Sequence, residues 1–191
     1  RTEKDPDVKP YIQKMHFQWE EVQFPPEFKK THSHLKDCWK SKLLEAQKYG
    51  YCSGTDLRKG EILQLQADLH QKIAQGERDF ELFRSVSLLA EALKVEHALE
   101  LLESQGLAQL HSYFVKIQQE AITSKVKATQ NLVLDANFKA AALLTSELLQ
   151  QGFEHPKLPR LLQLVEEVLL QNAAAKMIIF TQFRNSAEEI V

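Results

Sequence analysis

The stretch DFELFRSVSLLAEALKVEHALELLES, residues 79–104, decides the fold class of this chain. When it is wound at 100° per residue, apolar side chains cover most of its circumference. A surface helix shows a single apolar stripe, so a segment of this kind must be covered on several sides. The pattern predicts a central helix in a mainly α fold, and Gly106 is expected to end it.

Further helices are expected on both sides of this segment. Apolar residues recur at helical spacing in 28–46, 62–73, 107–121, 132–148 and 158–169. Pro26 suits the first turn of the first helix, whereas Gly76 and Gly152 are expected to end later ones. Short connections favour antiparallel neighbours, so the sequence predicts an antiparallel helical bundle over residues 25–153.

The two ends of the chain show a different pattern. Met177-Ile178-Ile179-Phe180 is a short β-prone apolar run that leads into a polar turn, which is typical of a buried strand followed by a helix. Residues 11–24 are also strand-like and stop at Pro25-Pro26. We therefore expect short pieces of an incomplete α/β domain on either side of the bundle, lying close to each other in space.

Composition indicates the compartment more clearly than the function. The chain has 191 residues, a formal net charge of -2 and two cysteines, Cys38 and Cys52. Two thiols without a signal peptide suggest a reducing compartment, and no apolar run approaches the roughly 18 residues that cross a bilayer. We expect an intracellular, cytoplasmic protein without membrane contact.

Positive charge is concentrated in two blocks. Residues 25–60 carry eight Lys or Arg against four acids, residues 61–110 four against nine, and residues 111–140 four against two. The blocks are Lys29, Lys30, Lys36, Lys40, Arg58 and Lys59, then Lys116, Lys125, Lys127 and Lys139. Such residues can contact phosphates without reading sequence, although a locally biased, solvated face is the alternative. Tyr49, Tyr51 and Tyr113 either stack on bases or belong to the core.

Catalytic and metal sites are not expected within these residues. The sequence contains no Gly-x-x-x-x-Gly-Lys-Ser/Thr phosphate loop, so the chain alone should not hydrolyse ATP. Its adjacent carboxylate pairs diverge by 100° on a helix and are poorly placed for joint acid–base work. His34 and Cys38 could face one zinc ion, with Cys52 as a third ligand, but the short paired spacings of structural zinc sites are missing.

Several motifs are similar to those of archaeal Hef-type and Fanconi anaemia M-type superfamily 2 DNA helicases. HPKL at 155–158 precedes MIIFTQFR at 177–184, and HALELLESQGL occupies 97–107. Near the start, DPDVKPYI at 5–12, FQWE at 17–20 and PPEF at 25–28 resemble the stretch that leaves the first motor domain in this family. The three regions follow the order found in the family.

This resemblance implies a domain organisation. Residues 1–24 would be a linker and the first strand of the second RecA-like motor domain, and residues 25–153 an all-helical, thumb-like insert. Residues 154–191 would begin the second motor domain proper with a helix, a strand and a helix.

The resemblance also implies an activity: an ATP-dependent helicase or translocase that acts on forked or branched DNA at stalled replication forks, associated with the nucleoid. ATP and Mg²⁺ would bind to the full-length protein, and the remaining motor domains and a C-terminal nuclease domain would be partners. Thr181 and Arg184 would contact the tracked strand; alternatively, Thr181 caps the turn and Arg184 pairs with Glu188.

Two alternatives remain open from the sequence. The chain could be a helical protein-interaction module whose acidic block, residues 61–103, is the partner surface. It could also be the duplex-RNA-binding insert of a related helicase.

Overall fold

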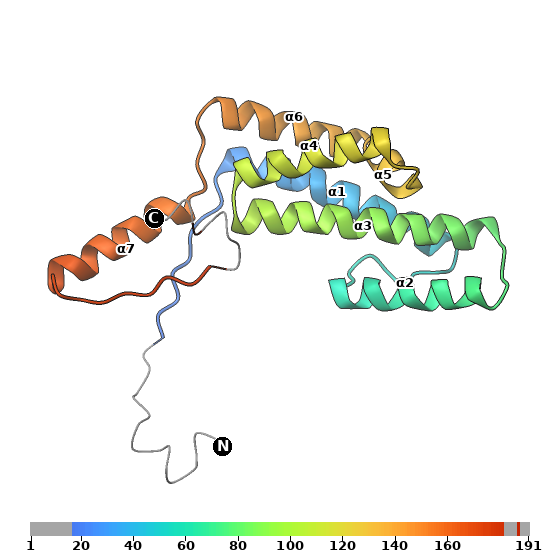
Figure 1. The fold of residues 1–191 in the computed structure, drawn as a ribbon, viewed down its shortest axis with the longest axis horizontal. Helices are drawn as coiled ribbons and strands as arrows, with labels where there is room; N and C mark the ends of the chain where they lie inside the picture. The colour runs from blue at the N-terminus through green and yellow to red at the C-terminus, as the bar shows by residue number, and fades with distance from the viewer. Residues whose placement is uncertain (1–16, 182–186, 188–191) are drawn as a thin grey trace, which may run out of the picture.

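The computed structural model describes residues 17–181 and Ala187. This part of the chain contains seven helices and no β-strand. They are α1 (Pro26–Lys48), α2 (Lys59–Ala74), α3 (Phe80–Ser104), α4 (Leu107–Thr123), α5 (Lys127–Leu132), α6 (Ala136–Gln150) and α7 (Lys157–Gln171). The first six form a bundle, and α7 projects from one end of it (Figure 1). The predicted mainly α fold is confirmed.

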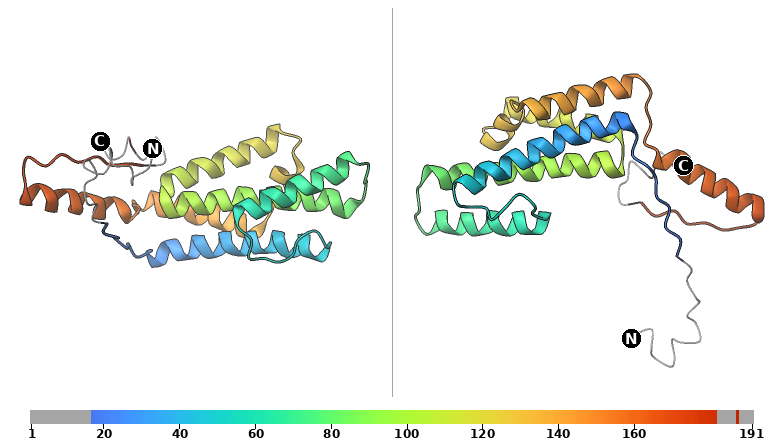
Figure 2. Two further views of the ribbon diagram at one scale, coloured as in Figure 1. Left: turned by 90° about the horizontal axis from the view of Figure 1, so that it is seen from below. Right: turned by 180° about the vertical axis from the view of Figure 1, so that it is seen from behind.

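Four helices form the body of the bundle. Helix α1 packs on α3 and α6, and α4 packs on the same two helices, so α1 and α4 lie diagonally opposite each other (Figure 2). Helix α2 lies against α3 on the outside, while the short α5 contacts α3 and α4. The apolar circumference of residues 79–104 is explained by this arrangement, because α3 is the helix that contacts α1, α2, α4 and α5.

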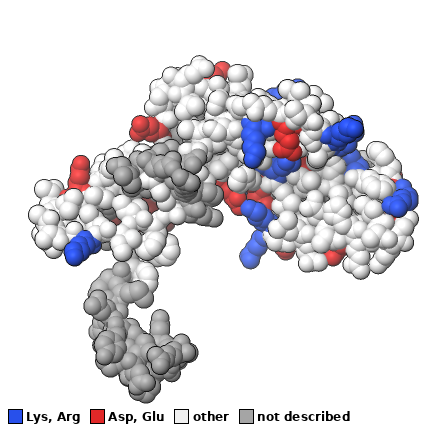
Figure 3. Space-filling view, viewed as in Figure 1, with Lys and Arg blue, Asp and Glu red and all other residues white. Residues whose placement is uncertain are grey.

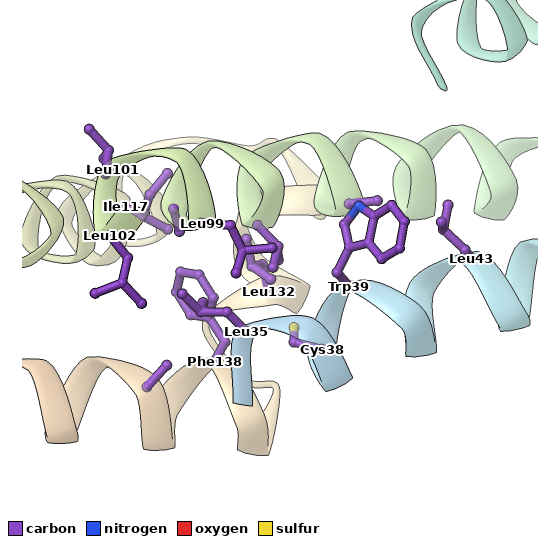
Figure 4. Close-up of a cluster of buried hydrophobic side chains, with 14 of the residues drawn as sticks. Leu35, Cys38, Trp39, Leu43, Leu99, Leu101, Leu102, Ile117, Leu132 and Phe138 are labelled. Atoms are coloured by element: carbon purple, nitrogen blue, oxygen red, sulfur yellow. The ribbon is translucent and has the colours of Figure 1, made fainter. Parts of the chain in front are cut away.

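The core is filled by side chains from all of the bundle helices. Leu35 of α1 lies near Leu99 and Leu102 of α3, Leu43 lies further along α1 beyond Trp39, and Phe138 of α6 closes the other side (Figure 4). All six are buried. Among the helices of residues 17–181, none is both long enough and apolar enough to cross a membrane.

The predicted fifth helix is divided into two. Helix α5 ends at Leu132, and α6 begins after Asp135, whose carboxylate accepts hydrogen bonds from the backbone N–H groups of Asn137 and Phe138 at 2.9 and 3.1 Å. A carboxylate at this position satisfies amides that have no partner inside the helix. The sequence prediction missed the break because Leu132 and Phe138 both face the core. The predicted ends at Gly76, Gly106 and Gly152 are confirmed.

Asp135 is expected to make stability depend on acid. Burial raises its pKa, but hydrogen bonds from Lys42 Nζ at 2.7 Å and from the Phe138 N–H outweigh burial and hold the pKa below its ordinary value. A carboxylate with a lowered pKa stabilises the fold above its unfolded-state pKa, and that contribution is lost as pH falls through the folded-state pKa.

A substitution by asparagine at position 135 distinguishes the effect of the negative charge from the effect of helix capping, because asparagine caps a helix about as well as aspartate. We expect Asp135→Asn to lower the free energy of unfolding by about 1.5 kcal/mol at neutral pH, from the loss of a charged hydrogen bond. The variant should also lose less stability than the wild type on acidification. Urea unfolding at neutral and acidic pH measures both, and equal pH profiles would contradict the role assigned to the charge.

The strands expected near the two ends do not form among the described residues. Residues 17–25 and 172–181 are without regular structure, and Phe17, Trp19 and Phe180 are exposed. A strand needs backbone partners on a neighbouring strand, and residues 17–181 offer none. The expectation that the two ends lie close together is confirmed, because Arg160 Nη2 of α7 lies 2.9 Å from Glu20 Oε2.

Candidate nucleic-acid interface

The first basic block lies mainly along α1. Lys29, Lys30 and Lys40 are exposed, whereas Lys36 is half-buried with Nζ 5.6 Å from the centroid of the Trp39 ring. An ammonium group over an indole is attracted by the ring, and its stem covers apolar surface. Lys36 therefore has a structural contact, and of the four predicted lysines on α1, Lys29, Lys30 and Lys40 are the best placed to reach phosphates.

A cleft separates this block from the acidic segment of the sequence. It lies between α1, residues 55–57 and α3, with Trp39, Leu57 and Leu99 as apolar lining. Its rims carry Lys36 and Lys40 from α1, and Glu96, Glu100 and Glu103 from α3. The basic and acidic blocks, separate along the chain, thus face each other in space.

Several of these charges are already paired. Lys59 Nζ lies 2.7 Å from Glu100 Oε1 and lowers the pKa of that carboxyl, which His97 also contacts at 3.3 Å. Arg58, at the N-terminus of α2, donates its backbone N–H to Glu61 at 2.6 Å, while its side chain is exposed. Lys59 is therefore less available to a phosphate than its exposure suggests.

The second block is spread over α4, α5 and α6. Lys116 is on α4, Lys125 precedes α5, Lys127 is its first residue, and Lys139 is on α6; all four are exposed. Since α4 and α1 are diagonal in the bundle, no flat surface includes both helices (Figure 2). Basic and acidic side chains are interspersed on the face that Figure 3 shows. The structure therefore places Lys116 of α4 diagonally opposite the lysines of α1, whereas Lys139 belongs to α6, which packs on α1.

Thr181 belongs to a third region. It is exposed and lines a cleft of about 620 Å³ between the end of the bundle, α7 and residues 20–22. Arg184 lies outside the described residues, as does its alternative partner Glu188. Sequence reasoning overlooked Arg160, which lines the same cleft and bonds both Glu20 and Glu167. The sequence gives no signal for this contact, because it depends on how the two ends of the chain meet.

The aromatic residues near the blocks are largely committed to the fold. The Tyr113 hydroxyl donates to the Lys94 carbonyl at 3.0 Å, and its ring packs edge-on against His97. Burial raises the pKa of Tyr113 above its ordinary value. Tyr51 is half-buried beneath Lys72 Nζ, 5.3 Å from the ring centroid. Of the two interpretations, the structure favours core packing over base stacking for Tyr113.

The three candidate zinc ligands have other partners or are buried. His34 Nδ1 lies 2.9 Å from Asn137 Oδ1, and the Cys52 thiol donates to the Gly54 carbonyl at 2.9 Å. Cys38 is fully buried, and burial raises the pKa of its thiol, which disfavours the thiolate that zinc requires. No group of three metal-ligating side chains occurs in the part of the chain described by the structure.

Comparisons with known proteins agree with this architecture. A family model described as "Putative ATP-dependent RNA helicase, helical bundle" matches residues 27–151. A protein of Methanocaldococcus jannaschii named "Putative ATP-dependent RNA helicase" is 33% identical over 192 residues, which cover 100% of this chain and 23% of the relative. The crystal structure of the Pyrococcus furiosus Hef helicase domain matches with a TM-score of 0.82 and 33% identity, over 100% of this chain and 40% of that one. The chain thus spans less than half of each relative.

Proposed function

Because the chain belongs to the family of helicase helical bundles, we propose that it is the insert region of an ATP-dependent superfamily 2 motor that acts on forked or branched DNA. In this proposal the bundle grips a duplex arm while the motor domains move along a strand. The observation that carries the proposal is the match to the Hef helicase domain, which extends over the whole chain at a TM-score of 0.82.

ATP and Mg²⁺ belong to the rest of this motor in the proposal. The 191 residues contain no phosphate-binding loop, and the described residues assemble no group of carboxylates and histidines suited to a metal ion. Residues 1–24 and 154–191 would then be pieces of the second motor domain, and a nuclease domain would follow it as in Hef-type proteins.

Helix α7 supports the proposed association with motor domains. It has no buried residue, and Leu162, Val168 and Leu170 are exposed by 51%, 41% and 86%. Ile178 and Phe180, in the segment after α7, are exposed by 80% and 90%. Large apolar side chains gathered on one element are typical of a surface that another element covers. We assign this surface to the remaining strands and helices of the second motor domain.

Duplex RNA is the second candidate ligand. Both the family description and the name of the Methanocaldococcus jannaschii relative refer to RNA helicases. The exposed lysines do not discriminate, since phosphate contacts carry no sequence information and occur in both nucleic acids. A-form geometry and 2′-hydroxyl groups distinguish duplex RNA from duplex DNA, so the two ligands must be compared directly.

Binding to nucleic acids should depend on the first basic block. We expect the 191-residue chain to bind forked DNA more tightly than single strands, with an affinity that falls steeply as salt rises. The triple variant Lys29→Glu/Lys30→Glu/Lys40→Glu should lower the affinity for forked DNA by about tenfold or more, because three phosphate contacts are lost. Fluorescence anisotropy with forked DNA, duplex DNA, duplex RNA and single-stranded DNA measures this at two salt concentrations.

A matched control uses three lysines of the second basic block. Lys125→Glu/Lys127→Glu/Lys139→Glu changes the net charge equally, so a general electrostatic effect would weaken binding by the same factor in both variants. A greater loss of affinity in the first variant would locate the nucleic-acid contact on α1. A greater loss of affinity in the second variant would locate the contact on α5, α6 and the residues just before α5. Tighter binding of duplex RNA than of forked DNA would replace the DNA proposal. Negligible binding of every ligand would refute the bundle as a nucleic-acid contact.

A further inference from the structure

Two sequence motifs that are far apart in the chain meet at the end of the bundle. HALELLESQGL runs from the end of α3 through the turn to the first residue of α4, and HPKL leads into α7. Gly106, in the first motif, has a φ of +95°, and a Cβ built on it would lie 2.9 Å from the Cβ of His155 in the second. The backbone of Gly106 and the side chain of His155 are so close that a larger residue at position 106 would collide with His155.

Two helices of the bundle hold the second motif in place. The His155 ring packs edge-on against Phe28 of α1, with centroids 6.1 Å apart. Lys157 Nζ donates to the Glu103 carbonyl at the end of α3, at 2.8 Å. The Glu103 carboxylate in turn lies 3.0 Å from Nε2 of His32 on α1. The start of α7 is therefore attached to α1 and α3 at the same time.

The chain segment that leads into α1 is held at the same place. Glu20 accepts hydrogen bonds from Arg160 of α7 at 2.9 and 3.2 Å. A little further along the chain, the Phe24 ring packs edge-on against Phe28 and His32, with centroids 5.4 and 5.9 Å apart. Both covalent connections to the bundle thus pass through one contact region, where rotation of α7 would break several contacts together.

We propose that Gly106, His155 and Lys157 form a rigid joint that fixes the angle between the helical bundle and α7. A six-residue connection such as 151–156 would otherwise let the two parts move as separate bodies. The three residues act as positioning residues: they set where the bundle points, and none of them needs to contact a ligand. The proposed joint does not involve nucleic acid, so this proposal is independent of the proposed contact between the bundle and DNA.

The joint can be tested by the distance between two spin labels on the 191-residue chain. Labels on cysteines introduced at Gln47 and Gln171, both exposed, report on the far ends of α1 and α7; the native Cys38 and Cys52 are buried. Because the 15 residues of α7 span about 22 Å, a tilt of about 15° moves its far end by about 6 Å. We expect one narrow distance distribution in the otherwise unchanged chain.

Gly106→Ala should shift or broaden this distribution, since its Cβ forces His155 away. Gly76→Ala is the matched control: its φ is +102°, but no atom lies within 4 Å of a Cβ built there. It imposes the same kind of backbone strain at the end of α2 and should leave the distance unchanged. His155→Ala provides an independent variant, because it removes the ring contact with Phe28 without altering a glycine.

Circular dichroism shows whether each variant keeps its helices. If Gly106→Ala does not fold, His155→Ala decides the outcome. The proposal would be overturned if the distance distribution of His155→Ala were as narrow as that of the wild type and centred at the same distance. If Gly106→Ala folds, its distribution must also match that of the wild type for this conclusion. A broad distribution in the wild type would overturn the proposal as well. Equal shifts in Gly106→Ala and Gly76→Ala would also overturn it, because backbone strain alone would then account for the change.

Discussion

Replacing Glu91 with alanine is expected to lower the free energy of unfolding by about 3–5 kcal/mol, because it removes the buried carboxylate that joins Lys42 to Arg84 and leaves each cation with one acidic partner fewer. Glu91 of α3 is fully buried. Its Oε2 lies 3.3 Å from Lys42 Nζ, and its Oε1 lies 3.1 Å from Arg84 Nη1. Lys42 is itself 7% exposed, so water cannot replace the lost carboxylate at that side chain.

The effect should be large because Glu91 joins several helices. Ser87 and Asn131 also donate to its Oε1, at 3.2 and 3.4 Å, which connects α3 to α5. Lys42 continues the network to Asp135 at the start of α6, and Arg84 forms a two-point contact with Glu45 of α1. Buried networks of this kind are costly when one member is missing.

Urea unfolding followed by circular dichroism measures the loss. The informative control is the double variant Glu91→Leu/Lys42→Met, which removes both charges and retains apolar volume. We expect it to be more stable than Glu91→Ala, since replacing a buried ion pair with apolar side chains is often neutral. A change below about 1 kcal/mol in Glu91→Ala would show that water compensates the charges of this cluster.

Replacing Phe138 with alanine is expected to lower the free energy of unfolding by about 3–5 kcal/mol through the cavity that it leaves. Phe138 of α6 is 2% exposed and packs edge-on against Phe114 of α4, with ring centroids 5.0 Å apart. An aromatic pair in this geometry contributes beyond its buried area. The contact lies between α4 and α6, so its loss should loosen that side of the bundle in particular.

Lys139→Ala is the matched control for this change. It truncates the next residue of the same helix, whose side chain is exposed, and should alter stability by no more than about 0.5 kcal/mol. Phe138→Leu should lie between the control and the alanine variant, since it fills part of the cavity. If Phe138→Ala and Lys139→Ala had equal effects, the aromatic contact would not support the packing of α4 on α6.

Much of the secondary structure could be predicted because helical signals are local. Apolar spacing identified the central position of α3, and Gly106 and Gly152 marked helix ends correctly. The prediction failed where a local signal was ambiguous or depended on a neighbour. The break before α6 needs the cap formed by Asp135, and residues 177–180 form no strand because strand formation depends on a partner elsewhere.

The candidate interface was predictable only in part. Sequence located the lysines and showed that charge is segregated along the chain, but it could not tell which of them point to solvent. Lys36 lies against Trp39, and Lys59 pairs with Glu100 of a different helix. The separation of Lys116 from the lysines of α1 follows from the diagonal placement of α1 and α4, which no local pattern encodes.

By itself, the sequence determined that this chain is a helical bundle with a buried central helix, since side-chain periodicity and helix-ending glycines act within a few residues of each other. Tertiary structure alone decided which charges meet. Glu91 lies within an acidic stretch of sequence, yet it is the buried partner of Lys42 and Arg84; His155 and Gly106 touch although 48 residues lie between them. The physical reason is that the partners of a side chain depend on how whole helices pack, and packing joins residues that are distant in the chain.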